Sequence, residues 1–154
     1  DVPDTPGHAA KIFSKLSDAH ISVDMIIQSY ARKIENTNDI AFTIDKTDLE
    51  KTLKTLDSIK SEIKASRFQV DDNIAKVSIV GAGMIDRPGI AASMFETLAR
   101  LGINIKMIST SEIKVSCLVD ENDAKRALVA LHETYGLGCD EVAEVKGTLP
   151  EEEL

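Results

Sequence analysis

The stretch Asp4-Thr-Pro-Gly-His-Ala-Ala-Lys-Ile-Phe13 decides the fold, because the chain contains it a second time as Asp86-Arg-Pro-Gly-Ile-Ala-Ala-Ser-Met-Phe95. The two copies lie 82 residues apart and align without a gap. Between residues 4–30 and 86–112, 11 of 27 aligned positions are identical. A repeat of this length is typical of a duplicated domain, because solenoid units have shorter periods. The sequence therefore predicts two domains of one fold, whose differences indicate different roles.

Composition excludes several classes of function. The 154 residues carry a formal net charge of −8, which opposes binding to a nucleic-acid backbone. We find neither an apolar run of about 18 residues nor a leader-peptide pattern, so we expect a cytoplasmic protein. Cys117 and Cys139 lack the spacing of metal ligands, and we expect free thiols in a reducing compartment. No cofactor and no metal are expected.

The second copy has a complete pattern of alternating strands and helices. Strand 75–80 alternates and is β-branched, and it ends at a Gly-Ala-Gly turn. Apolar residues at helical spacing predict a helix over 90–101, closed by Gly102, and another from residue 124 that stops at Gly136. Further strands are predicted at 103–109, 113–119 and 139–146, with a cap region at 120–122. The order β-α-β-β-α-β predicts an α+β, ferredoxin-like domain: a four-stranded antiparallel sheet with both helices on one face.

The first copy follows the same order from its helix onward. Thr47 and Glu50 fit a capping box at the start of its second helix. Its opening strand is missing, so that strand was either trimmed or is supplied by a segment from elsewhere. We predict domains at 1–72 and 73–146 and a mobile tail at 147–154. The elements expected in the first copy are helix His8–Ala19, strand Ile21–Tyr30, strand Ile40–Ile44 and helix Leu49–Ile63.

The repeated Asp-x-Pro-Gly motif precedes a helix in both copies. Gly7 and Gly89 allow a sharp turn and leave room beside the backbone, and unpaired amides at a helix start attract a carboxylate. Asp4 and Asp86 could hold an ammonium group nearby. The motif is therefore either an α-amino-acid site or only a favourable turn and helix cap.

The strand after the first helix bears on that choice. With a period of two residues, one face carries Ser22, Asp24, Ile26 and Gln28, and the other carries Ile21, Val23, Met25 and Ile27. Asp24 and Gln28 are then expected on one face, as solvated residues or as part of a site. The matching positions of the second copy are Asn104, Lys106, Ile108 and Thr110, so the copies are expected to contribute unequally.

These residues resemble a known family, the tandem ACT domains that form the regulatory part of aspartate kinase. The resemblance covers nearly the whole chain. It is most specific in Val80-Gly-Ala-Gly-Met84 and Ser109-Thr-Ser-Glu-Ile113. It implies feedback control of the first phosphorylation step toward lysine, threonine and methionine, with threonine and/or lysine as effectors. It also implies a homodimer with ligands at the seam of ACT domains, which the apolar Ile26 and Ile108 would fit, and a catalytic domain or subunit as partner. A chain of this kind has no turnover of its own.

The resemblance also implies a set of effector-binding positions. The chain departs from related chains at Ser22, where Asn is frequent, and at Ala41 and Ala91, where some carry Thr. The positions expected to bind the effector are Asp4, Gly7, His8, Ala9, Ser22, Val23, Asp24, Gln28, Ile90, Ala91, Asn104, Ile105 and Ser111.

The sequence argues against two other functions and leaves two alternatives open. A dinucleotide-binding enzyme would need a third glycine at position 86, where Asp86 stands. An RNA-binding module on the same fold would need stacking aromatics and basic residues, whereas only 4% of the chain is aromatic. An ACT pair that senses another amino acid for a different enzyme, or that serves only for dimerisation, stays open.

Overall fold

The computed structural model describes residues 1–29, 36–84 and 88–138. The chain divides into two compact units, Asp1–Asp72 and Asn73–Leu154, and each is described by itself. Within the described ranges, no helix combines the length and the apolar character that crossing a bilayer requires.

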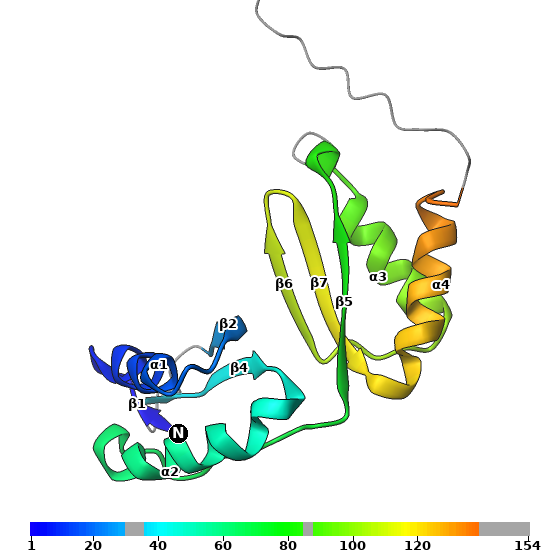
Figure 1. Ribbon diagram of the computed structural model, residues 1–154. Helices are drawn as coiled ribbons and strands as arrows, with labels where there is room; N and C mark the ends of the chain where they lie inside the picture. The colour runs from blue at the N-terminus through cyan, green and yellow to red at the C-terminus, as the bar shows by residue number, and fades with distance from the viewer. Residues whose placement is uncertain (30–35, 85–87, 139–154) are drawn as a thin grey trace, which may run out of the picture. The chain divides into compact units, whose positions relative to one another are not determined.

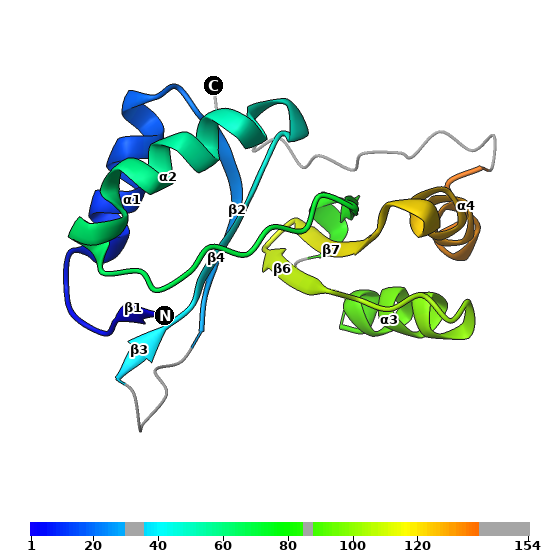
Figure 2. The ribbon, with the colours of Figure 1, turned by 90° about the horizontal axis from the view of Figure 1, so that it is seen from below.

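The second unit contains a three-stranded antiparallel sheet covered by two helices. The strand order is β5-β7-β6, so β7 is central and pairs with both neighbours. Figures 1 and 2 show α3 and α4 on the same face of this sheet. This arrangement confirms the predicted ferredoxin-like α+β fold, while the expected strand at 139–146 and the tail lie outside the described residues. The elements are β5 Ile74–Val80, η2 Ala82–Met84, α3 Ile90–Arg100, β6 Met107–Ser111, β7 Lys114–Asp120, η3 Glu121–Asp123 and α4 Ala124–Thr134.

The core of the second unit lies between this sheet and its helices. Met94 and Leu98 are fully buried on α3 and meet Val77 of β5 and Cys117 of β7. Burial raises the pKa of the Cys117 thiol, and its Sγ lies 4.0 Å from the Met94 Sδ. Cys117 is therefore a free, inaccessible thiol, as expected, and Cys139 lies outside the described residues.

The first unit also has two helices, but its four described strands form two separate two-stranded sheets. Strand β2 pairs with β4 in antiparallel fashion, and a separate two-residue pairing joins β1 to β3. The core is formed by side chains of α1, α2 and the loops beside them, among them Leu16 and Ile63 at 1% exposure each. The elements are β1 Val2–Pro3, α1 His8–Asp18, β2 Val23–Gln28, β3 Thr37–Asn38, β4 Ile40–Ile44, η1 Lys46–Asp48 and α2 Leu49–Ile63.

The start of α2 differs from the prediction. The N-cap position of α2 is Asp48, whose side chain makes no capping bond. Asp45 instead caps the preceding η1, and its Oδ1 accepts hydrogen bonds from the Thr47 backbone N–H and hydroxyl at 2.9 and 2.6 Å. These bonds lower the pKa of the Asp45 carboxyl. The predicted capping box is wrong, because a 3-10 turn precedes α2 and Glu50 pairs instead with Lys54. Asp120 caps η3 in the second unit in the same way, through Asn122.

The turn that ends the first helix of each unit has a left-handed residue. Gly102 adopts φ +68° after α3, and His20, 82 positions earlier, adopts φ +53° after α1. A left-handed conformation costs an L-residue about 1 kcal/mol or more, whereas glycine adopts it freely. His20 therefore carries backbone strain that the second unit avoids.

We expect His20→Gly to raise the free energy of unfolding by about 0.5 kcal/mol. Relief of the strain outweighs the greater freedom of glycine in the unfolded chain. The matched control is Gly102→Ala, whose added Cβ would meet no atom within 4 Å. That control should lower stability by about 1 kcal/mol through the backbone alone. Urea denaturation measures both, and a destabilised His20→Gly variant would contradict the assignment of strain.

Candidate functional site

Both repeated helices begin at a glycine in the left-handed region. Gly7 has φ +103° and Gly89 has φ +102°, and neither helix start receives a hydrogen bond from a capping side chain. The first intrahelical bonds are Lys11 N–H to Gly7 O and Ser93 N–H to Gly89 O. No atom lies within 4 Å of the position a Cβ would take on either glycine. Amide donors of the first turn thus lie beside open space, which favours an anion.

Asp4 is held near the start of α1 by the small β1–β3 pairing. Its Oδ1 accepts a hydrogen bond from Asn38 Nδ2 at 2.7 Å, and its backbone N–H donates to Asn36 O at 2.9 Å. Asn38 is only 5% exposed, and its Oδ1 is buried and has no hydrogen-bond partner among the described residues. A carboxylate and the uncapped amides of a helix therefore lie on the same loop, three residues apart.

His8 is the first residue of α1, and its imidazole contacts the loop before the helix. Its Nε2 lies 3.0 Å from Thr5 Oγ1, and its Nδ1 is buried and finds no hydrogen-bond partner in the described part of the chain. The ring is half-buried at the beginning of the helix. This position makes His8 a neighbour of any ligand bound at these amides.

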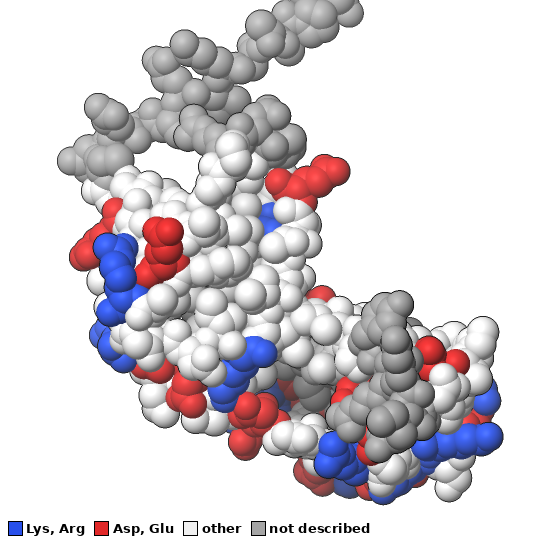
Figure 3. Space-filling view, turned by 180° about the vertical axis from the view of Figure 1, so that it is seen from behind, with Lys and Arg blue, Asp and Glu red and all other residues white. Residues whose placement is uncertain are grey.

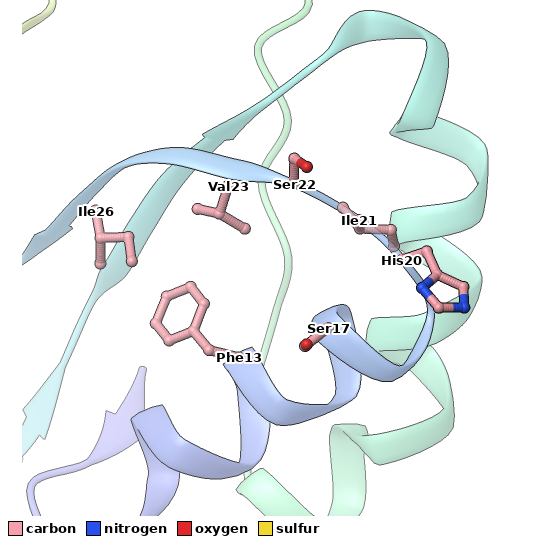
Figure 4. Close-up of a pocket in the computed structure, with 7 residues that line it drawn as sticks. All are labelled: Phe13, Ser17, His20, Ile21, Ser22, Val23 and Ile26. Carbon is pink, nitrogen blue, oxygen red and sulfur yellow. The ribbon is translucent and has the colours of Figure 1, made fainter.

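An open pocket of about 470 Å³ lies between α1 and β2. Figure 4 shows Phe13 of α1 facing Val23 and Ile26 of β2, with Ser17 at the other end of the helix. The described lining contains no carboxylate and no Lys or Arg, so it offers an apolar surface edged by neutral hydroxyls. Its residues are Phe13, Ser17, His20, Ile21, Ser22, Val23 and Ile26.

A β-bulge in β2 explains why Val23 and Ile26 face the same way. Val23 pairs with Ile44 and Ile26 pairs with Phe42, so two residues of β2, Asp24 and Met25, oppose Thr43 alone. Residues paired across a sheet share a face, and Ile44 and Phe42 both face the helices. The extra residue of the bulge therefore turns Val23 and Ile26 toward α1.

The bulge corrects the prediction that Asp24 and Gln28 share a face. Gln28 pairs with Ile40, two residues from Phe42, and thus lies on the face toward the helices. Asp24 opposes Thr43 and lies on the other face. Regular alternation was wrong here because it does not allow for an inserted residue.

Gln28 and Ala9 lie at the same end of the α1–β2 layer. The helix and the strand run in opposite directions in Figure 4. Ala9 is one helical turn before Phe13, and Gln28 is two residues beyond Ile26, which are steps of about 6 Å each in the same direction. Gln28 is exposed and Ala9 is half-buried. The structure therefore brings Gln28 to the end of the layer where Gly7 begins the helix.

The predicted residues of the second unit are not brought together in this way. The carbonyl of Ile90 accepts a hydrogen bond from Tyr135 Oη at 2.6 Å, and Ala91 and Ile105 pack against the core. Asn104 is exposed before β6 begins, whereas Ser111 is the last residue of β6. Asn104 therefore lies before β6 and Ser111 lies at its far end. Because the length of the strand separates them, the two residues do not form a common site within one unit.

The second copy of the Asp-x-Pro-Gly motif is described only from its later part. Asp86 lies outside the described residues, while Gly89 and the helix that follows it are described. The expectation that Asp86 holds an ammonium group therefore stays a prediction.

Several residues beside the predicted site were not foreseen from the sequence. Phe13 and Ile26 line the pocket, Asn38 holds Asp4, and Thr43 contacts the bulge. Phe13 could have been found from its helical spacing to Ala9. Asn38 is far in sequence from Asp4, and Thr43 is far from Met25. No feature of the neighbouring sequence predicts that either pair is in contact.

Nothing in the described parts of the chain suggests a metal centre. No group of three or more His, Cys, Asp or Glu side chains there has an arrangement that could hold an ion. Charges of both signs are interspersed on the face seen in Figure 3, without a basic cluster of the kind that nucleic-acid binding needs.

The duplicated fold and its glycine-capped helices define a class of small regulatory domains. The family described as "ACT domain" matches residues 1–58 and 77–135, and the chain belongs to this family. Within it, the chain is homologous to the regulatory part of aspartokinases. The regulatory subunit of aspartate kinase from Thermus thermophilus, in its ligand-free form, is 39% identical with a TM-score of 0.78, over 87% of each chain.

Full-length relatives match over a smaller share of their length. The aspartokinase of Mycobacterium tuberculosis is 44% identical over 94% of this chain, which spans 34% of that protein. The structure of E. coli aspartokinase III in complex with lysine and aspartate, in the T-state, is 28% identical with a TM-score of 0.60. It aligns with 84% of this chain, over 27% of its own length. The chain thus spans about a third of the curated relatives it matches.

We expect Asn38→Ala to lower the free energy of unfolding by about 1 kcal/mol, because the hydrogen bond to Asp4 is lost. Urea denaturation measures the change. Asn104→Ala, at an exposed position of the second unit, is the control and should change stability by less than about 0.5 kcal/mol. Equal stability of the two variants would contradict a structural role for the Asn38–Asp4 bond.

Proposed function

We propose that this chain is an allosteric region that binds threonine and/or lysine and thereby controls an aspartate kinase by feedback inhibition. The observation that carries the proposal is the start of α1, where uncapped amides after Gly7 lie on the same loop as the Asp4 carboxylate. An α-amino acid carries a carboxylate and an ammonium group on the same carbon atom. The loop offers a partner of opposite charge to each.

The pocket beside α1 supports this orientation of an effector. With its carboxylate at the amides of His8 and Ala9 and its ammonium near Asp4, an amino acid would direct its side chain along the α1–β2 layer. Gln28, at the same end of the layer, is an exposed hydrogen-bonding group. Phe13 and Ile26 would supply apolar contact farther along.

The neutral lining favours threonine over lysine in the first unit. In the described lining of the pocket, no carboxylate is available for the ammonium of a lysine side chain. Lysine stays in the proposal because the solved complex of E. coli aspartokinase III contains it.

The proposed route of control is a shift between two arrangements of a regulatory dimer. The effector binds one arrangement more tightly, and that arrangement disfavours substrate binding in the kinase partner. A coupling of about 1 to 3 kcal/mol would suffice. The residues proposed from the second unit, contributed by a second copy of the chain, are Ile90, Ala91, Asn104, Ile105 and Ser111.

We expect isothermal titration calorimetry of this chain to give saturable binding of L-threonine, and weaker or separate binding of L-lysine. Gln28→Ala should lower the affinity about tenfold, because one hydrogen bond to a charged or polar ligand group is worth about 1.5 kcal/mol. The matched control is Thr110→Ala, at the corresponding position of the second unit, which should change the affinity less than about twofold.

Two outcomes would argue against this proposal. If Asp24→Ala greatly lowered the affinity for the effector while Gln28→Ala left it unchanged, the site would lie on the other face of β2. The absence of heat with threonine, lysine, methionine and leucine would favour the alternatives: a sensor of another amino acid or a module that serves only for dimerisation.

A further inference from the structure

Thr43 makes an unusual contact at the point where β2 is irregular. The backbone N–H of Met25 donates a hydrogen bond to Thr43 Oγ1 at 3.0 Å, whereas a regular ladder would use a backbone carbonyl. Met25 and Asp24 are the two residues that oppose Thr43 alone. The threonine hydroxyl therefore satisfies a backbone donor within the bulge.

The bulge beside this contact determines which side chains of β2 face α1. Before the bulge, Val23 faces the helices, and after it Ile26 and Gln28 do so as well. Without the inserted residue, Val23 and Gln28 would lie on opposite faces, because alternation over five positions reverses direction. The bulge thus places both on the side where Gly7 begins α1.

The second unit lacks this hydroxyl at the corresponding position. Ile26 pairs with Phe42 and its counterpart Ile108 pairs with Cys117, so the next residues, Thr43 and Leu118, correspond. Leu118 has no hydroxyl, and the hydrogen bond described there runs from the N–H of Lys106, the counterpart of Asp24, to the Leu118 backbone carbonyl at 2.8 Å. A side-chain acceptor at this place is therefore a feature of the first unit.

We propose that Thr43 is a positioning residue for the effector site, since its hydroxyl holds the bulge that turns Val23 and Gln28 toward α1. The inference rests on the proposed function. Thr43 is not among the residues that line the pocket, so it acts through Met25 and not by touching the effector.

The test compares Thr43→Val, which keeps the shape and removes the hydroxyl, with Thr43→Ser, which keeps the hydroxyl. We expect Thr43→Val to lower the affinity for threonine, measured by calorimetry, about tenfold. The affinity of Thr43→Ser should stay within about threefold of that of the unchanged chain. Hydrogen exchange of the Met25 amide, followed by NMR, should accelerate in Thr43→Val only. Thr55→Val on α2, which removes a hydroxyl bonded to Lys51 O, is the control and should leave both readouts unchanged.

The outcomes separate this inference from the proposed function. If the unchanged chain binds threonine and Thr43→Val binds it equally well, the positioning role is overturned and the proposed function stands. If Met25 exchange is the same in Thr43→Val, the hydroxyl does not hold the bulge, and the inference is also overturned. If the unchanged chain binds neither threonine nor lysine, both fail together.

Discussion

The left-handed backbone at Gly7 and Gly89 is the constraint on which both units depend. At φ near +100° only glycine is comfortable, and the absence of a side chain leaves open space beside the first turn of each helix. The chain can therefore enter the helix sharply and still leave its first amides without a side-chain cap. The same geometry that starts the helix thus creates an electropositive position for an anion.

The two units differ in the contacts that surround this geometry. In the first unit, a bulge turns Val23 and Gln28 toward the helix, and Thr43 satisfies the backbone donor of the bulge. In the second, Tyr135 already bonds the Ile90 carbonyl at the start of α3. Duplication preserved the fold, while polar residues at matching positions of the two copies differ.

Small cores suit a regulatory role of this kind. Each unit has one layer of helices over a small sheet, and folded domains of this size have modest stability. A ligand that binds with a few kcal/mol of preference can then shift the balance between arrangements. Strain at His20, and an Asn38 Oδ1 that finds no partner among the described residues, indicate that the first unit is not optimised for stability alone.

The sequence by itself determined the duplication, the order of elements and the glycine turns, because these depend on local periodicity and on the conformational freedom of single residues. It predicted α2 at Leu49–Ile63 correctly, yet it misassigned the cap of that helix to Thr47. Only the tertiary structure decided which side chains of β2 face the helices, because the bulge that sets this depends on pairing with β4. It also decided the contacts of Asn38 and Thr43, since hydrogen bonds between distant residues leave no local pattern in the chain.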